Sequence, residues 1–240
     1  MTIIGPYINA VAIILGALIG SQLGKRLPEV LRNNLTSLFG LCSIGMGVVM
    51  VSKVAQMPAM ILSLLIGTII GELILLEKGI NRLASSMKGI IENILPSQAA
   101  KGQSQEEFLQ KFVAVMILFS FSGTGIFGAM NEGMTQDSSI LTVKSFLDFF
   151  TAIIFATGLG GSVAAIAIPQ TLVQIVLAYG AVFIIPFITS EMRADFAATG
   201  GMLMIATGFR ICNIKVFSVA NMLPALFIAM PLSALWTWLF

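Results

Sequence analysis

RADFAATGGMLMIATG, residues 193 to 208, repeats the frame of an earlier stretch, RNNLTSLFGLCSIGMG, residues 32 to 47. Aligned without a gap, the two stretches share one Arg, one Ile and two Gly at matching positions: Arg32 with Arg193, Gly40 with Gly201, Ile44 with Ile205, and Gly47 with Gly208. These identities suggest an internal repeat. What such a repeat would mean depends on the class of protein.

The composition excludes a soluble globular protein. Hydrophobic residues make up 57% of the chain, charged residues only 10%, and the mean hydropathy is +0.98. So few polar side chains cannot cover a globule of this size in water. Several apolar runs reach the roughly 20 residues that an α-helix needs to cross a bilayer. We therefore predict an all-α, polytopic transmembrane helix bundle that forms one integral membrane domain over residues 1–240.

Apolar runs and the residues that break them predict eight spans: 3–24, 35–53, 57–76, 110–130, 141–164, 168–189, 197–214 and 217–239. The similar stretches fall in the second and seventh spans, which cross the membrane in opposite directions because their separation is odd. The match therefore predicts an inverted-topology repeat, in which spans 6–8 repeat spans 1–3. Inverted repeats of this kind are found in many secondary transporters. The alternative is a chance match, since Gly-rich apolar sequences draw on few residue types.

Basic residues are concentrated in two loops. Lys25, Arg26 and Arg32 follow the first span, and Lys78, Arg82, Lys88 and Lys101 follow the third. The positive-inside rule places both loops in the cytoplasm and the N-terminus outside. Within the second loop, residues 78–107, apolar side chains recur every three or four residues, which predicts a cytoplasmic amphipathic helix on the membrane surface, followed by a flexible linker. The linker is either a plain tether or a binding site for a regulatory partner.

The sequence lacks the residues and motifs that several classes of protein require. The chain has no His, and its two cysteines, Cys42 and Cys212, lie in or beside apolar segments, so no metal site and no disulfide framework is expected. Nucleotide-binding, zinc-protease and serine-hydrolase motifs are missing, and we expect neither a cofactor nor an enzyme. A net charge of +2 gives no reason to expect a nucleic-acid partner. The expected partners are the lipid bilayer and a small solute or ion.

VKSFLD (143–148) and ICNIKVFSVANMLPAL (211–226) resemble the bacterial membrane-protein family known as domain of unknown function 554. The resemblance covers nearly the whole chain and includes IGTIIGE (66–72) and GIFGAMNEG (125–133). It implies a multi-pass protein of the bacterial cytoplasmic (inner or plasma) membrane, and it carries no activity over. Ser120 and Ser122 stand where we expect a Cys and a Gly in the family, which puts a role for that thiol in doubt.

Lys144 and Asp148 are the leading candidates for charge handling. Four residues apart on one helix, they are close enough to pair. Asp148 lies about 10 Å inside the membrane if its helix begins near residue 141, and a carboxylate there should face a polar cavity or a partner. The pair is either an ion or proton site, or an anchor at the outer end of the helix.

Four further polar residues are candidates for the pathway: Glu72, Asn221, Ser122 and Glu132. Glu72 either couples to transport or extends to the cytoplasmic surface. Asn221, close to Pro224, either binds a solute or belongs to an ordinary helix entry. Ser122 either lines a pathway or bonds to its own backbone.

Small residues and one Pro are expected to serve helix packing or hinges: Gly16, Gly20, Gly67, Gly71, Gly158, Gly201, Gly208 and Pro224. Their spacing also permits a homo-oligomer. We expect a transporter or channel for a small solute or ion, with its pathway between the repeat-related halves. The alternative is a non-transporting scaffold or sensor that acts through the cytoplasmic loop at residues 80–110.

Overall fold

The computed structural model describes residues 2–23, 28–86 and 105–239, and this part of the chain is helical without strands. The all-α prediction is confirmed. The α-helices are α1 (Gly5–Leu23), α2 (Glu29–Val51), α3 (Met57–Leu73), α4 (Leu76–Ser86), α6 (Gln105–Ser120), α7 (Gly123–Thr135), α8 (Ser139–Leu159), α9 (Ala167–Val182), α10 (Ser190–Ile211), α11 (Val219–Met222) and α12 (Pro224–Leu239). Two 3-10 segments, η2 (Gly160–Ile166) and η3 (Ile185–Phe187), complete the described elements.

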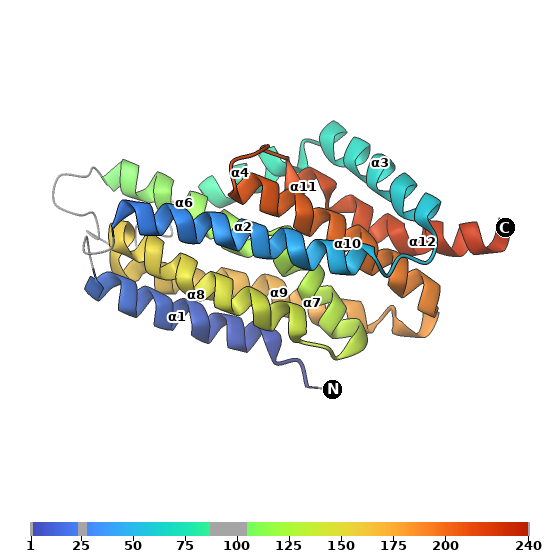
Figure 1. Ribbon diagram of the computed structural model, residues 1–240, viewed down its shortest axis with the longest axis horizontal. Coiled ribbons are helices and arrows are strands. Elements are labelled where there is room, and N and C mark those ends of the chain that lie inside the picture. The colour runs from blue at the N-terminus through green and yellow to red at the C-terminus, as the bar shows by residue number, and fades with distance from the viewer. Residues whose placement is uncertain (1, 24–27, 87–104, 240) are drawn as a thin grey trace.

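The long helices run side by side along one axis (Figure 1). The start of α1 packs beside the start of α8, where Gly5 meets Leu141. We call this the N-terminal end of the bundle. It also holds the turns α2–α3, α7–α8 and α9–α10. The connection from α8 to α9 through η2 lies at the opposite end, and α4 and the turn from α10 to α11 lie between that end and the middle of the bundle.

Five helical stretches are long and apolar enough to cross a membrane: Gly5–Leu23, Asn33–Val51, Gln105–Thr135, Ser139–Val182 and Val219–Leu239. A sixth is counted if α3 and α4, which are bent by 50°, form one span. The protein therefore has the apolar helices of a multi-pass membrane protein, whereas the eight spans remain a prediction. The predicted seventh span, α10, is not among the five, and it carries two charged residues, the buried Asp195 and the half-buried Arg210.

The stretch Ser139–Val182 is 44 residues long, too long for a single crossing. Gly160 breaks it with a φ of 68°, in the left-handed region that favours glycine. Leu141 of α8 and Ala178 of α9 nevertheless belong to one small core cluster at the N-terminal end. The chain therefore doubles back at η2, and α8 and α9 run antiparallel, as two separate spans require.

Small residues bring the helix backbones together, as expected for helices in lipid. A Cβ added at Gly16 or Gly20 would stand 2.3 Å from a carbonyl oxygen of α8. Gly67 and Gly71 of α3 fit against α12 and α11 in the same way. These two glycines therefore pack helices of the same chain against each other. Gly158 has no atom within 4 Å of such a Cβ, and a packing role is therefore not supported there.

Glycines also bring α2 close to α10. Gly47 lies against Gly201, and Gly40 lies against Gly208, so the two helices are antiparallel. Between these contacts, the Ser43 hydroxyl donates to the carbonyl oxygen of Met204 over 2.8 Å. The stretches that resemble each other in sequence therefore pack against each other.

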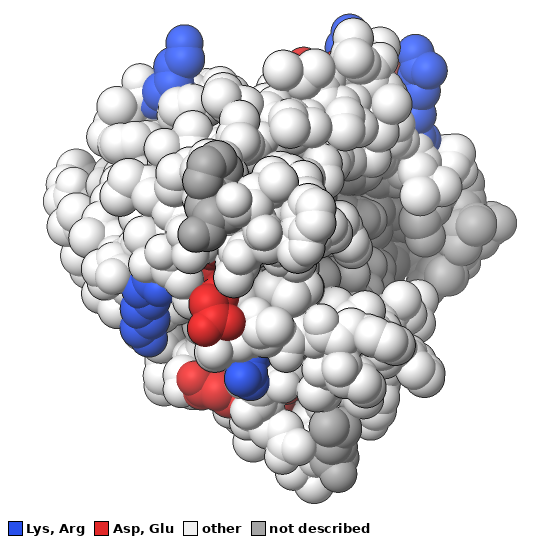
Figure 2. All heavy atoms as spheres, turned by 90° about the vertical axis from the view of Figure 1, so that its right-hand side faces the viewer, with Lys and Arg blue, Asp and Glu red and all other residues white. Residues whose placement is uncertain are grey.

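Apolar side chains are exposed and polar side chains are buried more often than in a soluble protein. Large apolar side chains lie on the outside, for example Ile69, Phe183 and Trp238, each more than half exposed. Buried positions include many polar residues, as described below. The N-terminal end, seen in Figure 2, carries only a few scattered charged side chains. This distribution is typical of a helix bundle whose sides face lipid.

The predicted amphipathic helix at residues 78–107 lies partly outside the described residues, because 87–104 are not described. Its described start belongs to α4, which buries Ala84 and packs Leu76 and Ile80 against the core clusters of the bundle. The other predicted cytoplasmic loop includes Lys25 and Arg26, which also lie outside the described residues.

Candidate functional site

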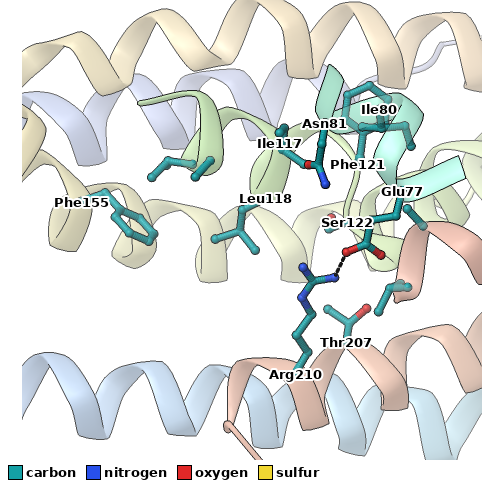
Figure 3. A pocket seen from close by; sticks show the side chains of 14 residues that line it. Glu77, Ile80, Asn81, Ile117, Leu118, Phe121, Ser122, Phe155, Thr207 and Arg210 are labelled. Atoms are coloured by element: carbon teal, nitrogen blue, oxygen red, sulfur yellow. Dashed lines mark hydrogen bonds and ion pairs between the residues drawn. The ribbon is translucent and has the colours of Figure 1, made fainter. Parts of the chain in front are cut away.

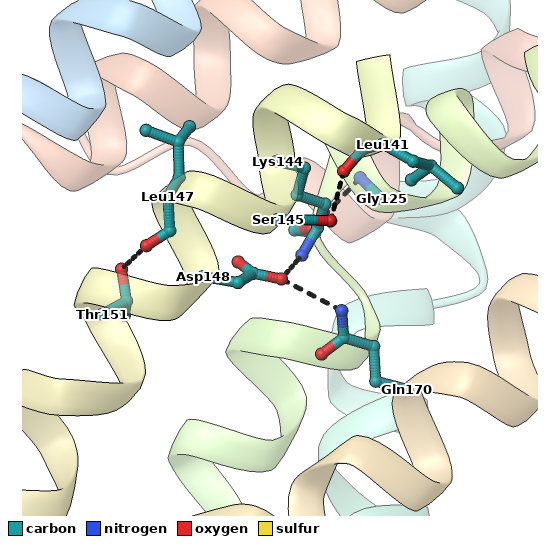
Figure 4. Close-up of polar contacts among 9 residues, drawn as sticks. Gly125, Leu141, Lys144, Ser145, Leu147, Asp148, Thr151 and Gln170 are labelled. Carbon is teal, nitrogen blue, oxygen red and sulfur yellow. Dashed lines mark hydrogen bonds and ion pairs between the residues drawn. The ribbon is translucent and has the colours of Figure 1, made fainter. Parts of the chain in front are cut away.

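Lys144 and Asp148 form a buried ion pair within the bundle. Both lie on α8, four residues apart, so their side chains project from the same face of the helix. Gln170 of α9 donates from Nε2 to Asp148 Oδ2 over 3.0 Å, and Figure 4 shows the three side chains converging. The Lys144 ammonium also lies 5.9 Å from the centre of the Phe119 ring. Removing two charges from water is costly, and the attraction between them offsets this cost only when further hydrogen bonds satisfy both groups.

Several polar atoms of neutral amides near this pair have no hydrogen-bond partner. Gln170 Oε1 and both polar atoms of Gln174 are buried without a hydrogen bond, as are both polar atoms of Asn9. Gln174 lies one turn after Gln170 on α9, so the two amides share a helix face. Asn9 belongs to α1, whose contacts with α8 place it at the level of Lys144. Unsatisfied buried polar groups are rare in folded proteins and point to water or a ligand.

A broken helix borders the pair. α6 ends at Ser120 and α7 begins at Gly123, so a helix starts inside the bundle. Ser122 is the N-cap of α7, and its hydroxyl accepts from Gly125 N over 3.1 Å. A Cβ at Gly125 would stand 2.8 Å from Lys144 Cε, so the glycine makes room for the lysine. Ser122 therefore does bond to its own backbone, and it also lines the cavities described next.

A cavity of about 380 Å³ extends from the ion pair toward the opposite end of the bundle. Lys144, Asp148 and Thr124 line its inner part, and Asn213 and Val216, in the exposed turn after α10, line its outer part. Its walls come mainly from α2, α6, α8 and α10 and are largely apolar, interrupted by Ser and Thr hydroxyls. The buried pair therefore borders a cavity whose lining also includes exposed residues.

A second cavity of about 340 Å³ lies beside the first, under α4 and α11. Five residues line both cavities: Leu118, Ser122, Phe155, Thr207 and Arg210. Arg210 Nη1 pairs with Glu77 Oε1 of α4 over 3.0 Å, and Figure 3 shows the two side chains meeting across the cavity. Arg210 also donates to the carbonyl oxygen of Phe217 over 3.2 Å.

Three of the predicted pathway residues lie away from the ion pair. Glu132 is buried near the N-terminal end, where its Oε1 accepts from Ile4 N and Gly5 N over 2.8 and 2.9 Å. Asn221 is buried in α11 and accepts from Glu77 N over 2.7 Å. Glu72 is exposed in the last turns of α3, outside both cavities. The structure therefore brings together only Lys144, Asp148 and Ser122 of the six.

Residues that sequence reasoning overlooked complete the buried polar set. Gln174 and Asn9 carried a signal, since each is an amide within an apolar helix. Asp195 is a fully buried carboxylate of α10 that accepts from Ala55 N, Gln56 N and the Ser233 hydroxyl over 2.9, 2.7 and 2.6 Å. It therefore holds the start of α3 and the second half of α12 against α10. Pro224 begins α12 directly after α11, as a helix entry does.

No cluster of His, Cys, Asp or Glu that could hold a metal ion occurs among residues 2–23, 28–86 and 105–239. Cys42 and Cys212 are not joined by a disulfide. Among the residues that line the larger cavity, Lys144 and Asp148 are the charged residues of its inner part.

Comparison with known proteins places the chain among membrane proteins. The sequence profile of the family described as Protein of unknown function (DUF554) matches residues 4–234. The chain is 53% identical over 235 residues to the uncharacterized protein YqgA of Escherichia coli (strain K12), covering 98% of both chains. It is 26% identical over 228 residues to the uncharacterized membrane protein YdfK of Bacillus subtilis (strain 168), covering 93% of both chains. No solved structure matches it.

Proposed function

This chain belongs to the DUF554 family, and we propose that it moves a small solute or ion across a bacterial cytoplasmic membrane. The observation that carries the proposal is the Lys144–Asp148 pair, buried in an apolar bundle at the inner part of a 380 Å³ cavity. Charged residues at membrane depth are costly and usually mark substrate or ion pathways. Pockets of a few hundred Å³ are of the size that binds small ligands.

The cavity opens toward the cytoplasm in this proposal. Lys78, Arg82 and Lys215 lie in the opposite half of the bundle, around the turn that lines the cavity's outer part. The positive-inside rule then puts this half toward the cytoplasm and the N-terminus outside. Solute enters from the cytoplasmic side in the described conformation, and the tightly packed N-terminal half, which contains Glu132, must open for it to leave.

Three contacts support an inverted repeat of spans 1–3 and spans 6–8. Each predicted pair of repeat-related helices is in contact: α1 with α9, α2 with α10, and α3 with α12. Ser43 and Met204 are bonded at a separation of 161 positions, the spacing that aligns Gly40 with Gly201. A residue that contacts its own counterpart lies on a two-fold axis, and the axis here lies midway between Gly40 and Gly47. Repeat-related halves that enclose a central site are the architecture of many transporters.

The test is flux through reconstituted liposomes. Purified protein is assayed with protons, monovalent and divalent cations, inorganic anions, small carboxylates and amino acids. We expect flux of at least one solute, lost in Asp148→Asn and retained in Asp137→Asn, which makes the same chemical change in an exposed turn. Because Asp148→Asn leaves Lys144 unpaired and could prevent folding, the double variant Lys144→Met/Asp148→Asn is assayed as well, and it should fold without transporting.

Each outcome decides the proposal. Flux by the native protein and by Asp137→Asn, but not by the folded double variant, supports transport through this site. Folded native protein without flux of any solute overturns it and favours a scaffold or sensor. Equal flux in the native protein and the folded double variant would show that the ion pair only holds the structure together.

A further inference from the structure

The start of α7 lies beside a lysine inside the bundle, which is an unusual combination. The N-terminus of a helix carries a partial positive charge, so a cation nearby is unfavourable. Lys144 Cε would nevertheless stand 2.8 Å from a Cβ at Gly125, in the first turn of α7. The only acidic side chain that contacts the ammonium among the described residues is Asp148. The ammonium and the positive end of α7 therefore lie close together, and the carboxylate of Asp148 contacts only the first of them.

The larger cavity carries no excess charge. Its lining includes two cations, Lys144 and Arg210. Lys144 pairs with Asp148, and Arg210 pairs with Glu77 over 3.0 Å. The case for a bound anion therefore rests on hydrogen-bond donors that lack acceptors.

Donors without acceptors gather at the same point. The first backbone hydrogen bond of α7 runs from Ile126 N to Ser122 O, so the N–H groups of Gly123 and Thr124 precede the hydrogen-bonded part of the helix. The amide of Gln174, which is 1% exposed, has no partner, and its Nε2 lies 3.5 Å from the position of a Cβ at Gly125. This buried amide points at the start of α7, and its position calls for an acceptor that the described residues do not supply.

We propose that this point binds the carboxylate of a small monocarboxylic acid, the solute class of the transport proposed above, on which this inference rests. The carboxylate accepts from Lys144, from the Gln174 amide and from the first N–H groups of α7. Helix N-termini inside broken spans bind anionic substrate groups in this way. The acyl chain lies along the apolar walls of the cavity, which include Leu118, Leu147 and Phe155. A cation at this point would face both the ammonium and the positive end of α7.

Binding is measured separately from flux. Purified protein in detergent is titrated with sodium acetate, propionate and butyrate, and its unfolding temperature and heat of binding are followed. Sodium chloride, butylammonium chloride and butanol are the comparison solutes. We expect saturable binding of the carboxylates that strengthens from acetate to butyrate. Gln174→Leu should weaken it about tenfold, the value of one hydrogen bond to a charged group. Gln110→Leu, at an exposed position on α6, should leave it unchanged.

The outcomes separate this inference from the proposed function. Carboxylate binding that is reduced by Gln174→Leu and unchanged by Gln110→Leu supports the anion site, even if flux is not observed. Equal binding of chloride or butanol, or binding of butylammonium alone, overturns it. An equal effect of the two Gln variants overturns it as well. Flux of a cation by protein that binds no carboxylate would leave the transport proposal standing and remove this one.

Discussion

Gly47→Ala should destabilise the protein relative to Gly45→Ala, two positions earlier on the same helix. A Cβ at Gly47 would stand 2.5 Å from Gly201 O, about 0.8 Å closer than an ordinary carbon–oxygen contact of about 3.3 Å. A Cβ at Gly45 would have no atom within 4 Å. Both glycines are helical, so the gain in helix propensity of about 1 kcal/mol is common to both and cancels in the comparison.

Overpacking of this kind costs about 1–3 kcal/mol. For a chain of this length each kcal/mol shifts the unfolding temperature by about 2–4 °C. Gly47→Ala should therefore unfold several degrees below Gly45→Ala in the same detergent. Gly201→Ala meets Gly47 O at 2.6 Å, and the double variant with Gly47→Ala should cost less than the sum of the single variants, because one separation of α2 and α10 relieves both contacts.

Thermal unfolding followed by circular dichroism checks these values, with far-UV spectra at low temperature as the control for folding. Equal unfolding temperatures for Gly45→Ala and Gly47→Ala would refute the close packing of α2 on α10. Strict additivity of Gly47→Ala and Gly201→Ala would refute a shared contact. Either result would also remove the main support for a two-fold axis at this crossing.

Two further predictions concern carboxylates. Asp195→Ala leaves two backbone N–H groups and the Ser233 hydroxyl unpaired and should cost at least about 3 kcal/mol, against about 1 kcal/mol for Ser233→Ala; similar losses in chemical unfolding would contradict this. In the α7–α8 turn, hydrogen bonds from the Ser139 side chain and backbone hold the pKa of Asp137 below its ordinary value of 3.8. This stabilisation is present above pH of about 4 and is lost as the pH falls through the lowered pKa. The stability difference between the native protein and Ser139→Ala should therefore be constant at neutral pH and shrink in acid.

Much of the fold could be predicted from composition and spacing. Apolar runs determined that the described chain is helical, and they predicted separate helices at 141–164 and 168–189, where α8 and α9 lie. The first of the two ends earlier than predicted, at Leu159, because the chain turns at Gly160. The small residues Gly16, Gly20, Gly67 and Gly71 were recognised as packing positions, because glycines one turn apart flatten a helix face. Gly158 was not distinguishable from them, since its surroundings depend on which helix, if any, lies opposite.

The candidate site was only partly accessible. Lys144 and Asp148 could be paired, since a four-residue separation places them on one helix face whatever the fold. Glu132 and Glu72 are also carboxylates near apolar runs, yet one accepts from the start of α1 and the other is exposed on α3. A sequence does not show which neighbour satisfies a polar group, so these could not be separated from Asp148.

By itself the sequence determined the helical membrane class, the Lys144–Asp148 pairing and the match between the stretches around Gly47 and Gly208. These properties are local or statistical, since they depend on hydropathy, on 3.6-residue periodicity and on residue identity along one segment. Only the tertiary structure decided that Gln170 reaches Asp148, and that the start of α7 stands against Lys144. Such contacts join helices that are distant along the chain, and they are set by how whole helices pack together.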